Sequence, residues 1–135
     1  MHLIGFELDR LEKHLLTLTA VVEESVQLAI KALEDCNYAL AKKVVDNDAQ
    51  VNRMEVELEE ECLKVLALHQ PVANDLRIIV AILKINNDLE RIADQAANIS
   101  ERAIAICEIG NGKNRQNIDE MAKKVLDMLE KSLDS

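Results

Sequence analysis

Hydrophobic residues recur every three or four positions along almost the whole chain, and proline and glycine interrupt this spacing at two places. Such spacing gathers apolar side chains into one stripe on an α-helix. The interruptions are Pro71, the single proline, and the segment Gly110–Gly112. Three glycines and one proline in 135 residues are too few turn residues for a β-sandwich or barrel. The sequence therefore predicts an all-α fold of long helices.

Four helical segments are expected. They span residues 7–35, 37–68, 72–109 and a last stretch from about 117, with Asn37 suited to cap the second. Each segment has one apolar stripe, so none is stable alone. Short connections make neighbouring helices antiparallel. We expect an up-down-up three-helix bundle over residues 6–109 and an additional fourth helix over residues 114–135.

The fourth segment resembles the first when the chain is shifted by 110 residues. Leu8–Leu11 then falls on Ile118–Met121, and the apolar positions that follow also coincide. Any two amphipathic helices match in this way, so chance resemblance stays open beside a true repeat. If the repeat is real, the fourth helix begins a second three-helix unit. Its unmatched apolar face would need a dimer partner, a swapped helix or a further half of the protein.

Charge and aromatic content exclude one large class of partner. The chain has 25 acidic and 16 basic residues, a net charge of −9, and only Phe6 and Tyr38 as aromatics. A negative protein repels phosphate backbones, and without aromatic platforms it cannot stack bases. We therefore expect no nucleic-acid partner.

The location of the protein is predicted from its apolar runs and cysteines. The longest wholly apolar run, Ile78–Leu83, is too short to cross a bilayer, and the first residues lack the features of a signal peptide. Cys36, Cys62 and Cys107 are widely spaced and form no C-x-x-C motif. We expect reduced, mostly buried thiols in a cytoplasmic protein that does not insert directly into a membrane.

Two rows of acidic residues flank the proline corner. Glu90 and Asp94 are four residues apart, which places them on one helix face, and Asp48 and Asn52 have the same spacing. Asn52 and Glu90 lie equally far from Pro71, as do Asp48 and Asp94. In an antiparallel pair, residues equally far from the corner meet at the same height.

Gathered carboxylates repel one another unless a cation offsets their charge. Oxygen-only ligands suit hard ions such as Mg²⁺, Ca²⁺, Mn²⁺ or oxidised iron. The predicted ligands are Glu90 and Asp94, with Asp48, Asn52, Asn98 and Glu101 as further members.

A metal-free interpretation of the same residues stays open. Acidic stripes on a protein of this charge are commonly solvated helix faces, and Arg91 and Arg102 can neutralise part of the row. The acidic run Glu55–Glu61 is expected to face solvent rather than bind metal. No nucleotide-binding motif and no paired nucleophile and base are present, so a catalytic site is not expected.

Several linked motifs resemble the PhoU family. They are HQPVANDLRII at 69–79, DLERIAD at 88–94, NIS at 98–100 and VVDND at 44–48, and the resemblance covers roughly residues 6–107. It implies two three-helix bundles in tandem, with multinuclear metal clusters, iron among them, held by Glu/Asp-x-x-x-Asp motifs. Glu90 and Asp94 fit that motif. Asp48 and Asn52 depart from it, because asparagine is a neutral ligand.

The resemblance also implies a function. PhoU-like proteins are cytoplasmic regulators or adaptors of phosphate uptake and negative regulators of the phosphate-starvation response, and they act through protein contacts. The implied partners are the ATPase subunit of a phosphate ABC transporter and a phosphate sensor kinase, and a homodimer is expected. The role is not enzymatic. Two alternatives remain: a metal-free cytoplasmic domain of an ion or phosphate transporter and, least favoured, a di-iron oxidase, whose Glu-x-x-His motifs are missing.

Overall fold

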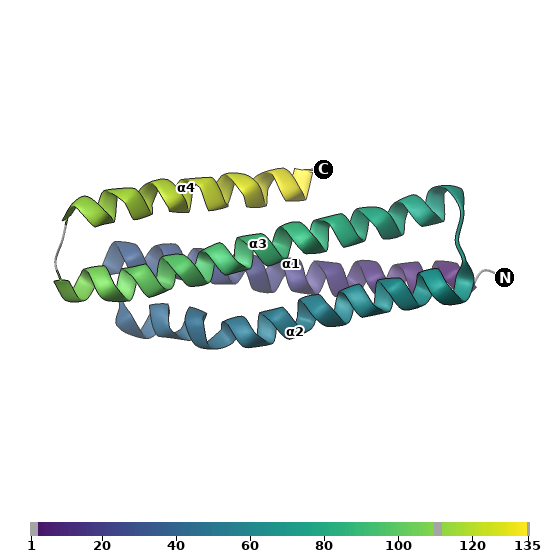
Figure 1. Cartoon of the computed structure of the whole chain (residues 1–135), viewed down its shortest axis with the longest axis horizontal. Helices are drawn as coiled ribbons and strands as arrows, with labels where there is room; N and C mark the ends of the chain where they lie inside the picture. Colours follow the sequence, from purple (N-terminus) through teal and green to yellow (C-terminus); the bar gives the residue numbers. More distant parts are fainter. Residues whose placement is uncertain (1–2, 110–111, 135) are drawn as a thin grey trace.

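Four long helices make up the fold in a computed structural model. The structure describes the backbone of residues 3–109 and 112–134, and the side chains of residues 4–107 and 119–133. The helices are α1 (Leu3–Asp35), α2 (Tyr38–His69), α3 (Ala73–Ile109) and α4 (Gly112–Asp134), and the described residues contain no strand. Figure 1 shows these rods in chain order. The predicted all-α class is confirmed.

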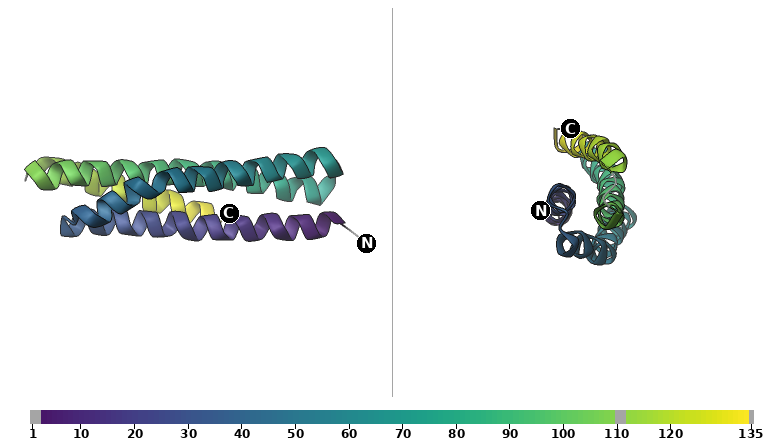
Figure 2. Two further views of the ribbon diagram at one scale, coloured as in Figure 1. Left: turned by 90° about the horizontal axis from the view of Figure 1, so that it is seen from below. Right: turned by 90° about the vertical axis from the view of Figure 1, so that its left-hand side faces the viewer.

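Successive helices run in opposite directions, as Figure 1 shows. Helices α1, α2 and α3 each contact the other two, whereas α4 packs mainly against α3 and touches α1 only slightly. Seen end-on in Figure 2, the four helices follow an open arc, with α4 beyond α3 and across from α1. The molecule therefore consists of a three-helix bundle with a fourth helix on one side.

The predicted apolar stripes form the core. Leu11 and Leu18 on α1, Leu58 on α2, and Leu89 and Ile92 on α3 are each at most 2% exposed. Burying a side chain of this size contributes about 1.5–3 kcal/mol. Because each helix presents such a stripe, their mutual burial holds the bundle together. The described helices contain no segment long and apolar enough to span a bilayer.

The two connections within the bundle are tight. The Oδ1 atom of Asn37 accepts a hydrogen bond of 3.2 Å from the backbone N–H of Leu40, so the predicted cap of α2 is confirmed. At the other end, Gln70 adopts a left-handed conformation and its N–H bonds the carbonyl of Leu66. Pro71 follows directly, so the chain turns at the predicted corner.

The predicted start of the fourth helix was wrong. Its expected start near Asn117 rested on reading the glycines as a stop signal, whereas α4 begins at Gly112. The first N–H groups of a helix have no intrahelical partner, so the first turn tolerates glycine better than the interior does. Gly110 and Asn111, the other predicted stop residues, lie outside the described residues.

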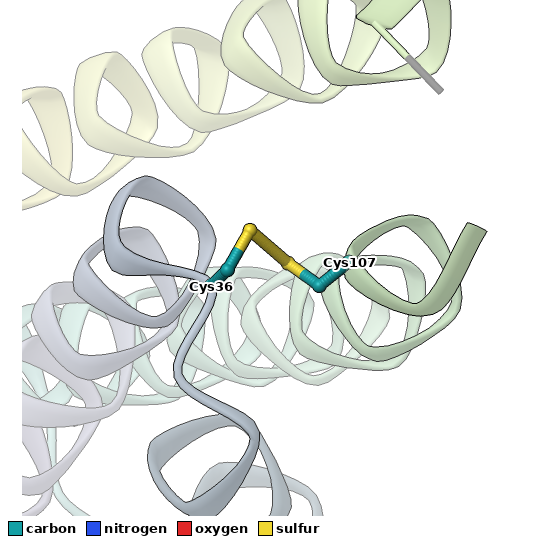
Figure 3. Close-up of a disulfide and its surroundings, with 2 residues drawn as sticks. All are labelled: Cys36 and Cys107. Atoms are coloured by element: carbon teal, nitrogen blue, oxygen red, sulfur yellow. A yellow bond between two sulfur atoms is a disulfide. The ribbon is translucent and has the colours of Figure 1, made fainter. Parts of the chain in front are cut away.

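The expectation of three reduced cysteines was wrong for two of them. Cys36 and Cys107 form a disulfide that joins the end of α1 to the last turns of α3 (Figure 3). They are 71 residues apart in sequence, and their Cα atoms are 5.5 Å apart. Helices α1 and α3 run in the same direction, so two distant residues arrive at the same end of the bundle. Cys62 is a free, buried thiol, as predicted.

Candidate metal centre

A buried hydrogen bond sets the alignment of α2 against α3. Asn86 Nδ2 donates to the backbone carbonyl oxygen of Glu55 at 2.9 Å, which places these two residues at the same height. The helices are antiparallel, so Asp48, seven residues farther from the corner than Glu55, lies level with residue 93. Asp48 and Asp94 are thereby brought to one level of the bundle, as their spacing from Pro71 predicts.

Acidic residues on α3 affect the pKa of the Asp48 carboxyl group. Burial raises its pKa first, and the negative charges of Asp94 and Glu101 raise it further. A hydrogen bond with the Asn52 side chain acts in the opposite direction. Two predicted ligands on α3, Asp94 and Glu101, therefore act on Asp48 across the α2–α3 interface, and a third, Asn52, acts on it within α2.

Glu55 lies beneath this row. Its side chain is only 3% exposed, and its Oε1 atom has no hydrogen-bond partner within the described part of the chain. Burial, followed by the charges of Glu90, Asp94 and Asp48, raises the pKa of Glu55 to about 8. The carboxyl group therefore holds its proton at neutral pH. We call Asp48, Glu55, Glu90, Asp94 and Glu101 the carboxylate row.

The prediction that the run Glu55–Glu61 faces solvent was wrong at Glu55. Glu57, Glu59 and Glu60 are exposed, and Glu61 is half-buried, with its Oε2 atom 2.8 Å from His14 Nδ1. Glu55 differs from them because it occupies a core position: it stands four residues after Val51 and three before Leu58, both buried. Helical spacing thus turns one acid of the run inward.

Sequence reasoning missed Glu55 and Asn86 as members of the site. A signal for both was available. Asn86 stands between Ile82 and Leu89 in the apolar stripe of α3, and all three are buried. A polar residue inside an apolar stripe indicates either a defect or a function: here Asn86 bonds α2 to α3, and Glu55 belongs to the carboxylate row.

Asn98, another predicted ligand, lies apart from the carboxylate row, and the described members of the row do not form a closed metal site. Asn98 is exposed on α3, and no described contact joins it to the row. Among the described residues, no three His, Cys, Asp or Glu side chains lie close enough together to hold one ion. The row is therefore a concentration of charge on one face, and ligation by its members stays a prediction.

The two predicted arginines, Arg91 and Arg102, do not neutralise the carboxylate row through ion pairs in the part of the chain that the structure describes. Within the described residues, neither Arg91 nor Arg102 forms an ion pair with a carboxylate. Arg102 Nη1 instead donates to Met121 Sδ at 3.1 Å, a contact between α3 and α4. Arg91 lies with Asp94 and Lys124 along a hollow of about 400 Å³ between α3 and α4. Among the side chains that the structure describes, no ion pair with a lysine or an arginine therefore offsets the charge of the row.

Comparison with known proteins identifies a family whose model matches most of the bundle. The family model described as the PhoU domain matches residues 15–103, which include the whole carboxylate row. The phosphate-specific transport system accessory protein PhoU homolog of Pseudomonas aeruginosa is 39% identical over 130 residues, covering 96% of this chain and 54% of that protein. The homolog from Aquifex aeolicus is 38% identical over 94% of this chain and 58% of its own length.

Solved structures agree with these relatives. The crystal structure of PhoU from Pseudomonas aeruginosa superposes with a TM-score of 0.85 at 39% identity, covering 96% of this chain and 63% of that one. That of the phosphate transport system regulatory protein PhoU from Streptococcus pneumoniae gives 0.76 at 27% identity, over 93% of this chain and 61% of that one. The chain spans about half the length of the curated relatives it matches. By its matched domain, its sequence and its fold, the chain belongs to the PhoU family.

Proposed function

We propose that this chain is a regulatory accessory protein of phosphate-specific transport, which acts in the cytoplasm by protein contact and binds metal at the carboxylate row. The regulatory role is supported by relatives named as accessory proteins of that transport system. No step of this role requires catalysis. A rigid bundle with one strongly negative face offers a surface on which partners can assemble.

The single observation that carries the metal part is the state of Glu55. A buried carboxyl with a pKa near 8 and an unpartnered oxygen is costly, and three further acids act on it. A cation bound beside these groups would offset the repulsion that raises the pKa. The oxygen donors fit hard ions such as Mg²⁺, Ca²⁺, Mn²⁺ or oxidised iron.

The oxygen donors of the carboxylate row suit such an ion, and the side chains that carry them must rotate to bind it. Glu90, Asp94 and Glu101 are exposed, so rotation about their side-chain bonds costs little. Glu90 and Asp94 are the principal ligands in this proposal, with Asp48, Asn52 and Glu101 beside them. Asn98 is retained only as a peripheral ligand. When ionised, Glu55 would add a negative charge beneath the ion.

Metal content tests the site. The purified chain is stripped with chelator, incubated with each candidate ion, desalted and measured by elemental analysis. We expect bound metal in the wild type and at least a tenfold loss in the Glu90→Ala/Asp94→Ala double variant. A control double variant, Glu57→Ala/Glu60→Ala, removes the same charge from exposed positions outside the row. Equal metal content in all three proteins would disprove the site.

The partners are tested separately. We propose that the chain contacts the ATPase subunit of a phosphate ABC transporter and a phosphate sensor kinase, and that it forms a homodimer. Binding to the purified ATPase subunit and to the cytoplasmic part of the kinase is measured by titration calorimetry with metal-loaded and metal-free protein. Absence of binding to both would reject the adaptor role even if metal binds.

A second candidate function has one observation in its favour. No three ligating side chains converge within the described residues, which suits a bundle that works without metal. In that case the chain is a metal-free cytoplasmic module of a phosphate or ion transporter. Full affinity for the ATPase subunit in the Glu90→Ala/Asp94→Ala variant, with no metal in the wild type, would favour it.

A further inference from the structure

We propose that Cys36 and Cys107 form a reversible redox clamp, which small thiols open and close in the folded protein by exchange at the Cys36 sulfur. The clamp fastens the α1–α2 turn to the last turns of α3 (Figure 3). This proposal does not depend on the proposed function, because its groups lie at the end of the bundle and outside the carboxylate row.

The turn that carries Cys36 argues for a role of its sulfur. The N–H of Asn37 bonds the carbonyl of Ala32 at 2.9 Å, and the N–H of Cys36 bonds that of Leu33. This pair of bonds is the Schellman motif, whose left-handed residue is usually glycine. Here that residue is Cys36, with φ of 50°. Cys36 therefore carries a side chain in a backbone conformation that favours glycine, which has none.

Access distinguishes this pair from the third cysteine. Cys36 is exposed and Cys107 is half-buried, and a cavity of about 190 Å³ borders both. Asn37, Tyr38 and Ile104 line the same cavity, so an attacking thiol has room beside the bond. Cys62 is fully buried, and burial together with Glu61 and Glu59 raises the pKa of its thiol to about 11. It therefore stays inert and serves as an internal control.

The chemistry is ordinary thiol–disulfide exchange. A low-molecular-weight thiolate attacks the Cys36 sulfur, the Cys36–Cys107 bond breaks, and Cys107 leaves as a thiolate. A second thiolate then attacks the small thiol's sulfur in this mixed disulfide, and Cys36 leaves as a thiolate, so the products are two protein thiols and one small disulfide. Closure is the reverse, with the small disulfide as oxidant. In a reducing compartment such a bond is transient, as redox-sensing disulfides are.

Opening the clamp has a local structural consequence. Within the described residues this bond is the only crosslink between the α1–α2 turn and α3, and the turn otherwise depends on its capping hydrogen bonds and on packing of Ala32 and Ala41. Without it we expect the segment 32–41 to open more often. Amide hydrogens there should then exchange on the order of tenfold faster, while those around Leu89 stay unchanged.

The experiment equilibrates the native protein in glutathione buffers from fully reduced to fully oxidised, quenches it in acid and alkylates it for peptide mass analysis. We expect the Cys36–Cys107 link in oxidised buffer, two alkylated cysteines in reduced buffer, and full reversal in the folded state. Alkylation of both cysteines in oxidised buffer would overturn the proposal. Resistance of the bond to reduced buffer without denaturant would do so equally, since it would then be a permanent crosslink.

Two variants separate the clamp from the turn itself. Cys107→Ala removes the bond and leaves Cys36 in place, and Cys36→Gly removes the bond while giving the turn the residue it favours. Both should show fast exchange over residues 32–41 in oxidised and reduced buffer alike, with Cys36→Gly the slower of the two. If wild-type exchange is also the same in both buffers, the bond controls nothing and the clamp is rejected.

Discussion

The three-helix bundle and α4 use the same kind of amphipathic helix with different results. On α1, Leu11 and Leu18 are each 1% exposed, because α2 and α3 both cover that helix. A shift of 110 residues places Met121 and Met128 of α4 at the equivalent positions, and both are only partly buried along the hollow beside α3. Leu126 and Leu133 on α4 are 43% and 52% exposed. On α4, Ala122, Val125 and Leu129 join the core, whereas the apolar side chains beside them stay partly open to solvent, because fewer helices surround α4.

The largest expected effect tests this contrast with one chemical change in two places. Leu89→Ala, at a fully buried position of α3, should lower the free energy of unfolding by about 2–5 kcal/mol. Leu129→Ala on α4 should cost less, because α4 packs mainly against α3 and touches α1 only slightly, and Leu129 is already 6% exposed. Urea denaturation followed by circular dichroism measures both. Equal losses would show that α4 is as integral to the fold as α3.

The second effect concerns the crosslink, which joins α1 to α3 and leaves α4 out. Oxidised wild-type protein should exceed reduced protein in free energy of unfolding by about 2–4 kcal/mol, because the bond restricts an unfolded chain across a 71-residue separation. Urea melts with and without reductant measure the difference, and the Cys107→Ala variant is the control with none expected. A wild type insensitive to reductant would contradict the bond's contribution.

The third effect lies inside the bundle and depends on pH. Glu55 keeps its proton in the folded state up to a pKa of about 8, against 4.5 for the ordinary group, so unfolding releases a proton between those values. Stability contributed at this position is therefore present at low pH and declines as pH rises toward 8. Glu55→Gln removes that decline and should be about 1–3 kcal/mol more stable than wild type at pH 9.

Chelator must be present throughout, because a bound cation would favour the ionised carboxylate. Thermal or urea unfolding at pH 4 and pH 9 measures the effect, and at pH 4 the two proteins should be nearly equal. Glu60→Gln, at an exposed position of the same helix, is the control: it keeps Glu55, so its stability should decline with rising pH as that of the wild type does. A wild-type stability that rises from pH 5 to pH 8 would contradict the buried, protonated state.

The smallest effect is expected on the outer face of α4. Leu126→Gln should change the stability of the monomer by no more than about 0.5 kcal/mol, since the residue is 43% exposed on the surface. Sedimentation velocity on wild type and variant tests whether the face is used. If the variant loses a dimer that the wild type forms, α4 is covered in the assembly and its contrast with the bundle disappears.

Much of the fold could be predicted because the sequence signals of a helix lie between residues that are close together in the chain. Steps of three and four identified all four helices, Asn37 was recognised as a cap, and Pro71 marked the corner. The start of α4 was misplaced because glycine near a helix end marks a stop or a start depending on its neighbours. The alignment of Asp48 with Asp94 was also predictable, since it follows from counting residues on either side of one short turn.

What the sequence by itself determined is therefore the set of helices, the chemical nature of the row and the family. Only the tertiary structure decided that Glu55 points inward, that Asn86 bonds its backbone, and that Cys36 meets Cys107. The reason is physical. Helical periodicity arises between residues three or four apart, whereas burial of an acid and contact between two sulfurs depend on how separate helices are rotated and aligned against one another.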